Sequence, residues 1–362
     1  MATIELRQVE ILFGETHAVK PMDLTINDGE FVVLLGPSGC GKTTTLRMIS
    51  GLETVTNGRI HIGNQDVTWR HPSDRDIAFV FQLYALYPHL TVRQNITFPL
   101  EAQNASPELI RDRLQLVTDL LQIQHLMRLR PGGLSGGDKQ RVALARALVR
   151  QPSAFLMDEP LGALDAEFRE TMRADIKKLH ISQKATTVYV THDQIEAMAM
   201  GDRIVVMSAA VVQQVGTPAG VYYDPLNLFV ARFIGSPGMN LVAGTLTDNV
   251  VHLPGGNTYA VPEKWQRTLA GQLSSNKVIM GFRPEAAHTT SSGQFAAGVY
   301  ASDLHGAFNM LHLSLNDEAD VVHVRAERGE GHTIGDNVRF DLDPEMVRFF
   351  NPKTETAVLP QT

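Results

Sequence analysis

The chain has 362 residues, 43% hydrophobic and 20% charged, which excludes disordered and collagen-like classes and leaves room for two domains. Its 32 Lys and Arg against 39 Asp and Glu give a formal net charge of −7, which argues against a dedicated nucleic-acid binder. With no apolar run of about 18 residues, no leader-like N-terminus and one cysteine, Cys40, the sequence predicts a soluble cytoplasmic protein.

Up to about residue 235, short β-branched runs alternate with amphipathic helical patterns, which is typical of an α/β fold with a buried parallel sheet. The predicted strands are Phe31–Leu35, Ala154–Met157, Thr187–Val190 and Arg203–Met207. The two clearest helices are predicted over 108–127 and 165–182, where apolar residues recur at helical spacing.

After about residue 236 the segments become short and strand-like, and Gly, Asn, Asp and Pro interrupt them. The predicted strands here are Met239–Leu246, Val278–Phe282, Asn309–Leu315 and Val321–Ala326. We therefore expect an α/β domain over 1–235 and a smaller all-β domain over 236–362, joined near the Ser-Pro-Gly at 236–238.

Residues 36–43 read GPSGCGKT and match G-x-x-x-x-G-K-[ST], directly after the strand Phe31–Leu35 and before a helical stretch. The glycines let the backbone curl so that its N–H groups point inward, and the helix N-terminus adds a positive dipole end. Lys42 can reach the β- and γ-phosphates of a nucleotide, and the Thr43 hydroxyl can bind Mg²⁺. An ordinary glycine turn is the alternative. The residues expected to contact nucleotide are Gly36, Pro37, Ser38, Gly39, Cys40, Gly41, Lys42, Thr43 and Thr44.

Two further segments fit this chemistry. The strand at 153–159, SAFLMDE, ends in Asp158 and Glu159 at the edge where open α/β sheets bind ligands. Asp158 would hold Mg²⁺ and Glu159 would polarise the attacking water, although a solvated strand end is the alternative when this motif is taken alone. The segment 134–141, LSGGDKQR, precedes another helix, either as a helix cap or as a second anion site for a nucleotide held by another subunit.

Taken in their order along the chain, these motifs resemble those of the ATPase subunit of ATP-binding-cassette transporters. The closest likeness is to the importer group that serves maltose, other oligosaccharides and glycerol-3-phosphate. The matching elements are GPSGCGKT, the glutamine Gln82 of VFQLYALYPHLTV, LSGGDKQR, FLMDEP, LGALDA and YVTHDQIEAM. The likeness covers the first domain throughout and the second more thinly, through FIGSPGMN, GFRPE and FDLDPEMVRFFNP.

The resemblance implies roles within one chain. Phe13 would stack on adenine, and a core phenylalanine is the alternative. Gln82 would touch Mg²⁺ or the attacking water, and a plain loop amide is the alternative. His192 would contact the γ-phosphate and hold the water and Glu159 in line, so the implied catalytic residues are Glu159, His192, Lys42 and Gln82.

It also implies roles across a dimer. Ser135, Gly136 and Gly137 would close on the γ-phosphate of a partner's ATP, with Asp138 near the ribose. Asp165 would communicate across the dimer, although a helix N-cap is an equally good local interpretation. Two copies would sandwich two ATP molecules, close with ATP and open after hydrolysis to ADP and phosphate.

The implied partners are a second ATPase chain, in a homodimer, two membrane permease subunits and, indirectly, a solute-binding protein, with no nucleic acid. The chain would sit peripherally on the cytoplasmic face of the inner membrane. A helical subdomain is expected at about 88–150, and the second domain resembles the family's OB-like regulatory barrel. Gln82–Val92 is the candidate docking surface, and simple packing within the helical subdomain is the alternative. The alternatives are a non-sugar cargo (polyamine, sulfate, phosphonate or ferric ion), an ATPase acting on nucleic acid, or a regulator with little turnover.

The sequence departs from the family pattern at three places. Asp138 stands where Gln is usual, which adds negative charge near ATP, and Gly162-Ala163 replaces the commoner Ser-Asn. Ala209-Ala210 stands where a turn glycine is usual, and a positive φ there would cost about 1 kcal/mol. We also predict that alkylation of Cys40 blocks ATPase activity and that bound ATP protects it.

Overall fold

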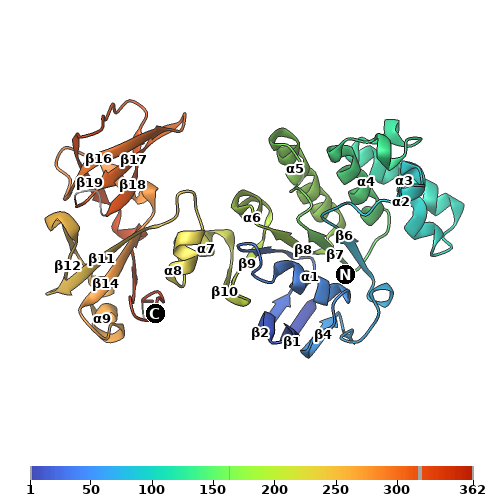
Figure 1. Ribbon diagram of the computed structural model, residues 1–362, viewed down its shortest axis with the longest axis horizontal. Helices are drawn as coiled ribbons and strands as arrows, with labels where there is room; N and C mark the ends of the chain where they lie inside the picture. Colours follow the sequence, from blue (N-terminus) through green and yellow to red (C-terminus); the bar gives the residue numbers. More distant parts are fainter. Residues whose placement is uncertain (1, 163, 317–319, 361–362) are drawn as a thin grey trace. The chain divides into compact units, whose positions relative to one another are not determined.

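The computed structural model describes residues 2–162, 164–316 and 320–360. The chain divides into two compact units, Met1–Pro218 and Ala219–Thr362 (Figure 1). This division falls after Pro218, whereas the sequence predicts the boundary near residue 236. The helices α7 (Pro218–Tyr223) and α8 (Leu228–Phe233) account for this difference. The buried Arg283 of the second unit donates to the carbonyl of Tyr222, and Leu228 and Ala231 pack with Met239.

A six-stranded sheet forms the centre of the first unit, with the order β10-β9-β3-β8-β7-β6. Its strands are β3 (Phe31–Leu35), β6 (Ile77–Val80), β7 (Ala154–Asp158), β8 (Thr186–Thr191), β9 (Arg203–Ser208) and β10 (Val211–Gly216). All neighbours pair in parallel except β9 and β10. Every residue of β3, β7 and β8 is buried, as their continuous apolar runs predict.

A second sheet of four antiparallel strands has the order β2-β1-β4-β5. Its strands are β1 (Ile4–Phe13), β2 (Thr16–Ile26), β4 (Asn57–Ile62) and β5 (Gln65–Asp66). The helix α1 (Lys42–Ser50) contributes Leu46 and Ile49 to one core that includes Ile4 of this sheet and Leu34 of the larger one. The middle and end of α1 therefore pack in a core that both sheets share.

The remaining helices of this unit are α2 (Val92–Glu101), α3 (Pro107–Leu121), α4 (Gly136–Leu148), α5 (Ala166–Gln183) and α6 (Gln194–Met200). Short 3₁₀ turns occupy Pro72–Asp74, Gln124–Leu126 and Pro131–Gly133. The helix predicted over 108–127 ends at Leu121, because Gln122 adopts a left-handed conformation. The helix predicted over 165–182 is α5, and Asp165 caps it.

The hairpin β9–β10 turns through Ala209 and Ala210, whose φ angles are 49° and 64°. Both alanines therefore adopt the left-handed conformation in which alanine is less favourable than glycine. The Ala210 carbonyl accepts the N–H of Lys20 at 2.9 Å, which ties this turn to β2.

The second unit contains two antiparallel sheets of five strands each, β13-β12-β11-β14-β20 and β15-β19-β16-β17-β18. The first has β11 (Asn240–Thr247), β12 (Val250–His252), β13 (Thr258–Ala260), β14 (Lys277–Phe282) and β20 (Arg348–Phe350). The second has β15 (Ala287–Thr289), β16 (Phe295–Leu304), β17 (Phe308–Ser314), β18 (Val321–Glu327) and β19 (Asn337–Leu342).

Helix α9 (Glu263–Gln272) and the 3₁₀ turns Pro254–Gly256, Pro284–Ala286 and Pro344–Met346 complete this unit. Its core is aromatic, with Trp265, Phe282, Phe295, Phe340 and Phe349 buried together. The four strands that the sequence predicts here are β11, β14, β17 and β18, so the expected all-β, barrel-like domain is confirmed. Among the described residues of the whole chain, no helix combines the length and apolar content that crossing a bilayer requires.

Candidate nucleotide-binding site

The loop between β3 and α1, residues 36–43, is shaped to bind an anion, and we call it the phosphate loop. Lys42 is the first residue of α1, and its side chain is 5% exposed. Its ammonium donates to the carbonyls of Gly36 at 2.8 Å and Pro37 at 2.9 Å, so the loop curls around the lysine. No side chain caps α1 and no acidic residue lies in its first turn, so its N–H groups and positive dipole end face the loop.

Two glycines of the phosphate loop are required sterically. A Cβ on Gly36 would lie 2.2 Å from the Met207 carbonyl oxygen. Gly41 has a φ of 103°, and a Cβ there would lie 2.7 Å from the Ala18 carbonyl oxygen. The tip Pro37–Gly39 is exposed, whereas the Cys40 thiol is buried, so an alkylating reagent reaches Cys40 only when the loop opens.

At the carboxyl end of β7, Asp158 meets Thr43 of the phosphate loop. The Thr43 hydroxyl donates to Asp158 Oδ1 at 2.8 Å. Burial raises the pKa of Asp158, and the hydrogen bond from Thr43 opposes this rise. Two oxygen ligands beside a phosphate-binding loop fit Mg²⁺, which takes its other ligands from phosphates and water. Among the described residues, no group of three or more His, Cys, Asp or Glu could hold a metal ion.

Glu159, next to Asp158, lies between two predicted catalytic side chains. Gln82 Nε2 donates to Glu159 Oε2 at 3.2 Å, and His192 Nδ1 lies 3.2 Å from Glu159 Oε1. The Glu159 N–H donates to the Val190 carbonyl of β8 at 3.0 Å, and its φ of 45° lies in the left-handed region, where a non-glycine residue is strained. The structure therefore brings Gln82, Glu159 and His192 together at the edge where the sequence predicts them.

The second glycine-rich loop, Leu134–Asp138, is called the signature loop here. Ser135 caps α4: its hydroxyl accepts the Asp138 N–H at 3.1 Å and donates to Asp138 Oδ2 at 2.8 Å. The other oxygen of Asp138 pairs with Arg141 Nη2 at 3.1 Å. The helix-cap interpretation of this loop is thus confirmed locally, and Arg141 balances the charge that Asp138 adds.

The predicted site residues are only partly assembled within one chain. In the described part of the chain, no hydrogen bond or ion pair joins the signature loop to Lys42, Asp158 or Glu159. Phe13, at the end of β1, is 54% exposed. Asp165 caps α5 by accepting the Phe168 N–H at 3.0 Å, as its local alternative predicts. Of the departure at Gly162-Ala163, Ala163 lies outside the described residues.

Comparison with known proteins identifies the family. An ABC transporter model matches residues 19–162, and a MalK OB fold domain model matches residues 235–287. The sulfoquinovosyl glycerol transport ATP-binding protein SmoE of Agrobacterium fabrum is 41% identical over 360 residues, 99% of this chain and 100% of SmoE. The chain belongs to the ABC transporter family. The trehalose/maltose import ATP-binding protein MalK of Thermococcus litoralis is 44% identical over 375 residues, again 99% of this chain and 100% of that protein.

A solved structure supports the same assignment for the cassette. It is the dimeric, post-hydrolysis ATP-binding cassette MJ0796 bound to ADP and phosphate, 34% identical, with a TM-score of 0.55. The match covers 59% of this chain and 98% of that chain. The protein is an ABC-type ATPase, the ATP-hydrolysing subunit of an importer.

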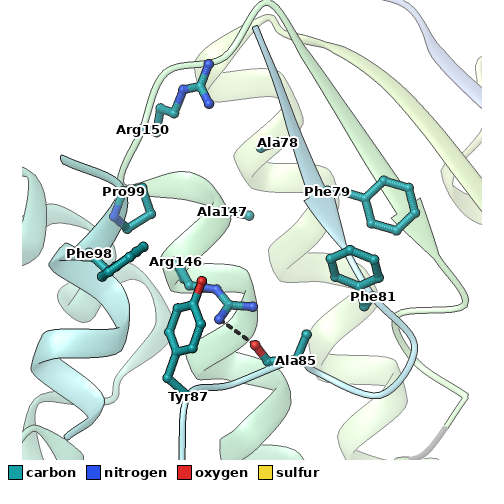
Figure 2. Close-up of a pocket in the computed structure, with 10 residues that line it drawn as sticks. All are labelled: Ala78, Phe79, Phe81, Ala85, Tyr87, Phe98, Pro99, Arg146, Ala147 and Arg150. Atoms are coloured by element: carbon teal, nitrogen blue, oxygen red, sulfur yellow. Dashed lines mark hydrogen bonds between the residues drawn. The ribbon is translucent and has the colours of Figure 1, made fainter. Parts of the chain in front are cut away.

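A pocket of about 430 Å³ lies between the predicted docking segment, residues 82–92, and the helices α2 and α4 (Figure 2). Arg146 of α4 donates to the carbonyls of Ala85 at 2.7 Å and Tyr84 at 2.9 Å, and its guanidinium lies 5.6 Å from the Tyr87 ring centroid. Tyr84 and Ala85 have φ angles of 61° and 48°, so this arginine holds a strained turn. Sequence reasoning missed Arg146, although α4 carries arginines at 141 and 146, and Arg150 follows its end.

Proposed function

We propose that this ABC ATPase drives import of a carbohydrate and works as a Mg²⁺-dependent homodimer beneath two permease subunits. The similarity over the full length to importer subunits named for sulfoquinovosyl glycerol and trehalose/maltose carries this proposal. A third relative, the xylose/arabinose import ATP-binding protein XacJ of Haloferax volcanii, is 44% identical over 371 residues and matches 99% of this chain and 96% of its own length.

In the proposed mechanism, Lys42 and the N-terminus of α1 bind the β- and γ-phosphates of ATP. Thr43 and Asp158 would hold Mg²⁺, which neutralises charge on the phosphate oxygens when it is bound. Glu159 orients the attacking water and accepts its proton, because it is the carboxylate next to this site with two side chains fixing its oxygens. Gln82 and His192 keep Glu159 in place, and the Phe13 ring stacks on the base.

The proposed active unit contains two chains, because one chain holds both halves of a site without joining them. Ser135, Gly136 and Gly137 of one copy face the γ-phosphate on its partner, with Asp138 near the ribose and Asp165 at the contact between copies. The dimeric state of the solved cassette supports this arrangement. Since phosphate-loop and signature residues occur in one sequence, two identical chains suffice.

We assign the pocket of Figure 2 to a helix of a permease subunit, which places the ATPase peripherally on the cytoplasmic face of the membrane. Its lining is apolar and aromatic with two arginines, a combination that suits an amphipathic helix. Leu83, which lies between the lining residues Phe81 and Ala85 in the sequence, is 84% exposed and offers further apolar surface. A solute-binding protein would deliver the cargo to the permeases.

The Glu159→Gln variant tests the hydrolytic mechanism. We expect turnover to fall on the order of 1,000-fold, because the amide cannot accept a proton from water. ATP should still bind and hold two chains together, which size-exclusion chromatography with and without ATP measures. Glu167→Gln, an exposed carboxylate in the first turn of α5, is the matched control. Unchanged turnover in Glu159→Gln would remove Glu159 from its role.

The cargo is tested with the complete transporter in proteoliposomes. We expect ATP-dependent uptake of an oligosaccharide or a sugar glycoside, and none of polyamine, sulfate, phosphonate or ferric ion. Uptake of one of these other solutes without any sugar would overturn the carbohydrate assignment and leave the ATPase assignment intact.

A further inference from the structure

Arg169, in the first turn of α5, contacts two loops that the proposed mechanism treats separately. Its Nη2 donates to the Leu164 carbonyl at 3.1 Å, and its Nη1 lies 3.4 Å from Asp193 Oδ2. Leu164 directly precedes Asp165, and Asp193 directly follows His192. One guanidinium therefore bridges the Asp165 loop (164–165) and the His192 loop (192–193).

Asp193 is a firm attachment point because both of its oxygens and its N–H are used. Its Oδ1 accepts the N–H groups of Ile195 at 2.8 Å and Glu196 at 3.2 Å, which caps α6. Its own N–H donates to Thr191 Oγ1 at 3.0 Å. The backbone on both sides of His192 is thus fixed through Asp193. A displacement of the Asp193 carboxylate would therefore also displace His192.

The buried carboxylate of Glu196 strengthens this attachment. Its Oε2 accepts the hydroxyls of Thr191 at 2.7 Å and Tyr189 at 2.9 Å. Burial raises the pKa of Glu196, and the charge of Arg169 is one of the influences that oppose this rise. Arg169 therefore acts electrostatically on a second carboxylate, on the helix α6 that follows this loop.

Arg169 suits this bridging role chemically. A guanidinium stays charged and presents several donors in one plane, so it can hold a carbonyl and a carboxylate at once. Its side chain is 34% exposed and that of Asp193 is 24% exposed, so solvent screens this pair less than a fully exposed one. A lysine ammonium, a single point charge, would hold one of the two groups less directionally.

The same turn of α5 also contacts α4, the helix that the signature loop opens, which we call the signature helix. Ring carbons of Phe168 would lie 3.3 Å from a Cβ on Gly137, and the Arg141 guanidinium lies 4.8 Å from the Phe168 ring centroid. Phe168 and Arg169 thus place one helical turn against the signature helix, the Asp165 loop and the His192 loop of the same chain.

We propose that Arg169 is a positioning residue that makes the Asp165 loop and the His192 loop move together during the ATPase cycle. The inference rests on the proposed function, in which His192 serves the chain's own ATP while Asp165 and the signature loop face the partner. A movement of the Asp165 loop at the dimer contact then displaces His192 through Arg169. Arg169 thereby couples the two ATP sites.

Arg169→Gln tests this coupling in the full-length protein assembled with its permeases. We expect kcat to fall about 10- to 100-fold, because loops that are slightly misplaced lose alignment. The KM for ATP should change less than about threefold, since the phosphate loop is untouched. The Hill coefficient for ATP should fall from about 2 toward 1 as the sites become independent.

Three further variants separate coupling from folding. Arg169→Lys keeps the charge and should restore part of kcat without restoring the Hill coefficient. Asp193→Asn keeps the α6 cap but loses the ion pair, so it should lower the Hill coefficient with an unchanged melting temperature. Lys178→Gln, which removes an exposed cation of the same helix, is the control and should behave as wild type.

The outcomes distinguish this inference from the function on which it rests. Wild-type kcat and Hill coefficient in both Arg169→Gln and Asp193→Asn would overturn the bridge while Glu159→Gln still abolishes turnover. A wild-type Hill coefficient of about 1 would overturn the coupling as well. If Glu159→Gln retains turnover, the proposed hydrolytic site fails instead.

Discussion

The first unit contains two glycine-rich loops that each open a helix, and they are built differently. In the phosphate loop, Lys42 curls the backbone around its ammonium and no side chain caps the helix. In the signature loop, Ser135 caps the helix and Asp138 adds a carboxylate to its first turn. One helix N-terminus is open to an anion, whereas the other already has an internal acceptor.

This difference indicates an order of events. The phosphate loop can bind the phosphates of ATP with groups from one chain. The signature loop must turn the Ser135 hydroxyl from Asp138 toward a phosphate, so its engagement competes with an existing hydrogen bond. Nucleotide binding should therefore precede and drive contact between two chains.

A large effect on nucleotide binding is expected from Lys42→Ala, which removes the only charged donor of the phosphate loop itself. Loss of charge-assisted hydrogen bonds to two phosphates should weaken ATP binding on the order of 100-fold. Titration with a fluorescent ATP analogue measures this loss, and Lys178→Ala is the control. Near-normal binding would show that the helix N-terminus alone holds the phosphates.

A second pair of variants compares the loops directly. Gly36→Ala places a methyl group 2.2 Å from the Met207 carbonyl oxygen, so the loop must distort and ATP binding should be lost. Gly137→Ala meets only side chains, the Phe168 ring at 3.3 Å and Leu164 Cδ2 at 3.7 Å, so the chain should fold and bind ATP but dimerise poorly. Binding and ATP-dependent dimerisation are measured for both. Equal loss of nucleotide binding would contradict the distinction between the loops.

Much of the phosphate loop was predictable, because its determinants lie in eight adjacent residues next to an apolar strand. The buried strands β3, β7 and β8 were predictable for the same local reason. The polar, irregular strands β1 and β2 were not, since bulges interrupt their alternation. Contacts such as Arg169 with Asp193, 24 residues apart, depend on how helices pack and leave no local signal.

A moderate effect is expected from Asp138→Gln, which removes the carboxylate that occupies Ser135. The ATP concentration for half-maximal hydrolysis should fall about two- to fivefold, since the serine hydroxyl is freer and a negative charge is gone. The melting temperature should drop slightly, because α4 loses about 0.5 kcal/mol of dipole stabilisation. Steady-state kinetics and calorimetry check both, and a higher half-maximal concentration would reverse the interpretation of Asp138.

The smallest effect concerns the β9–β10 hairpin, in which the Met207 carbonyl of β9 lies against Gly36 of the phosphate loop. Ala209→Gly should raise the free energy of unfolding by about 0.5–1 kcal/mol, because glycine relieves the left-handed strain. Ala102→Gly, at an exposed position with a φ of −63°, should instead lower it. Chemical denaturation of both variants measures this. No gain in Ala209→Gly would mean that the turn is not strained.

The exposed ring of Phe13 has a consequence for nucleotide specificity under the proposed function. A flat aromatic face accepts any purine, while the loop around Lys42 distinguishes a triphosphate from a diphosphate by its charge. GTP should therefore be hydrolysed nearly as well as ATP, so that under the proposed function turnover would depend on the ratio of nucleoside triphosphate to diphosphate rather than on the identity of the base.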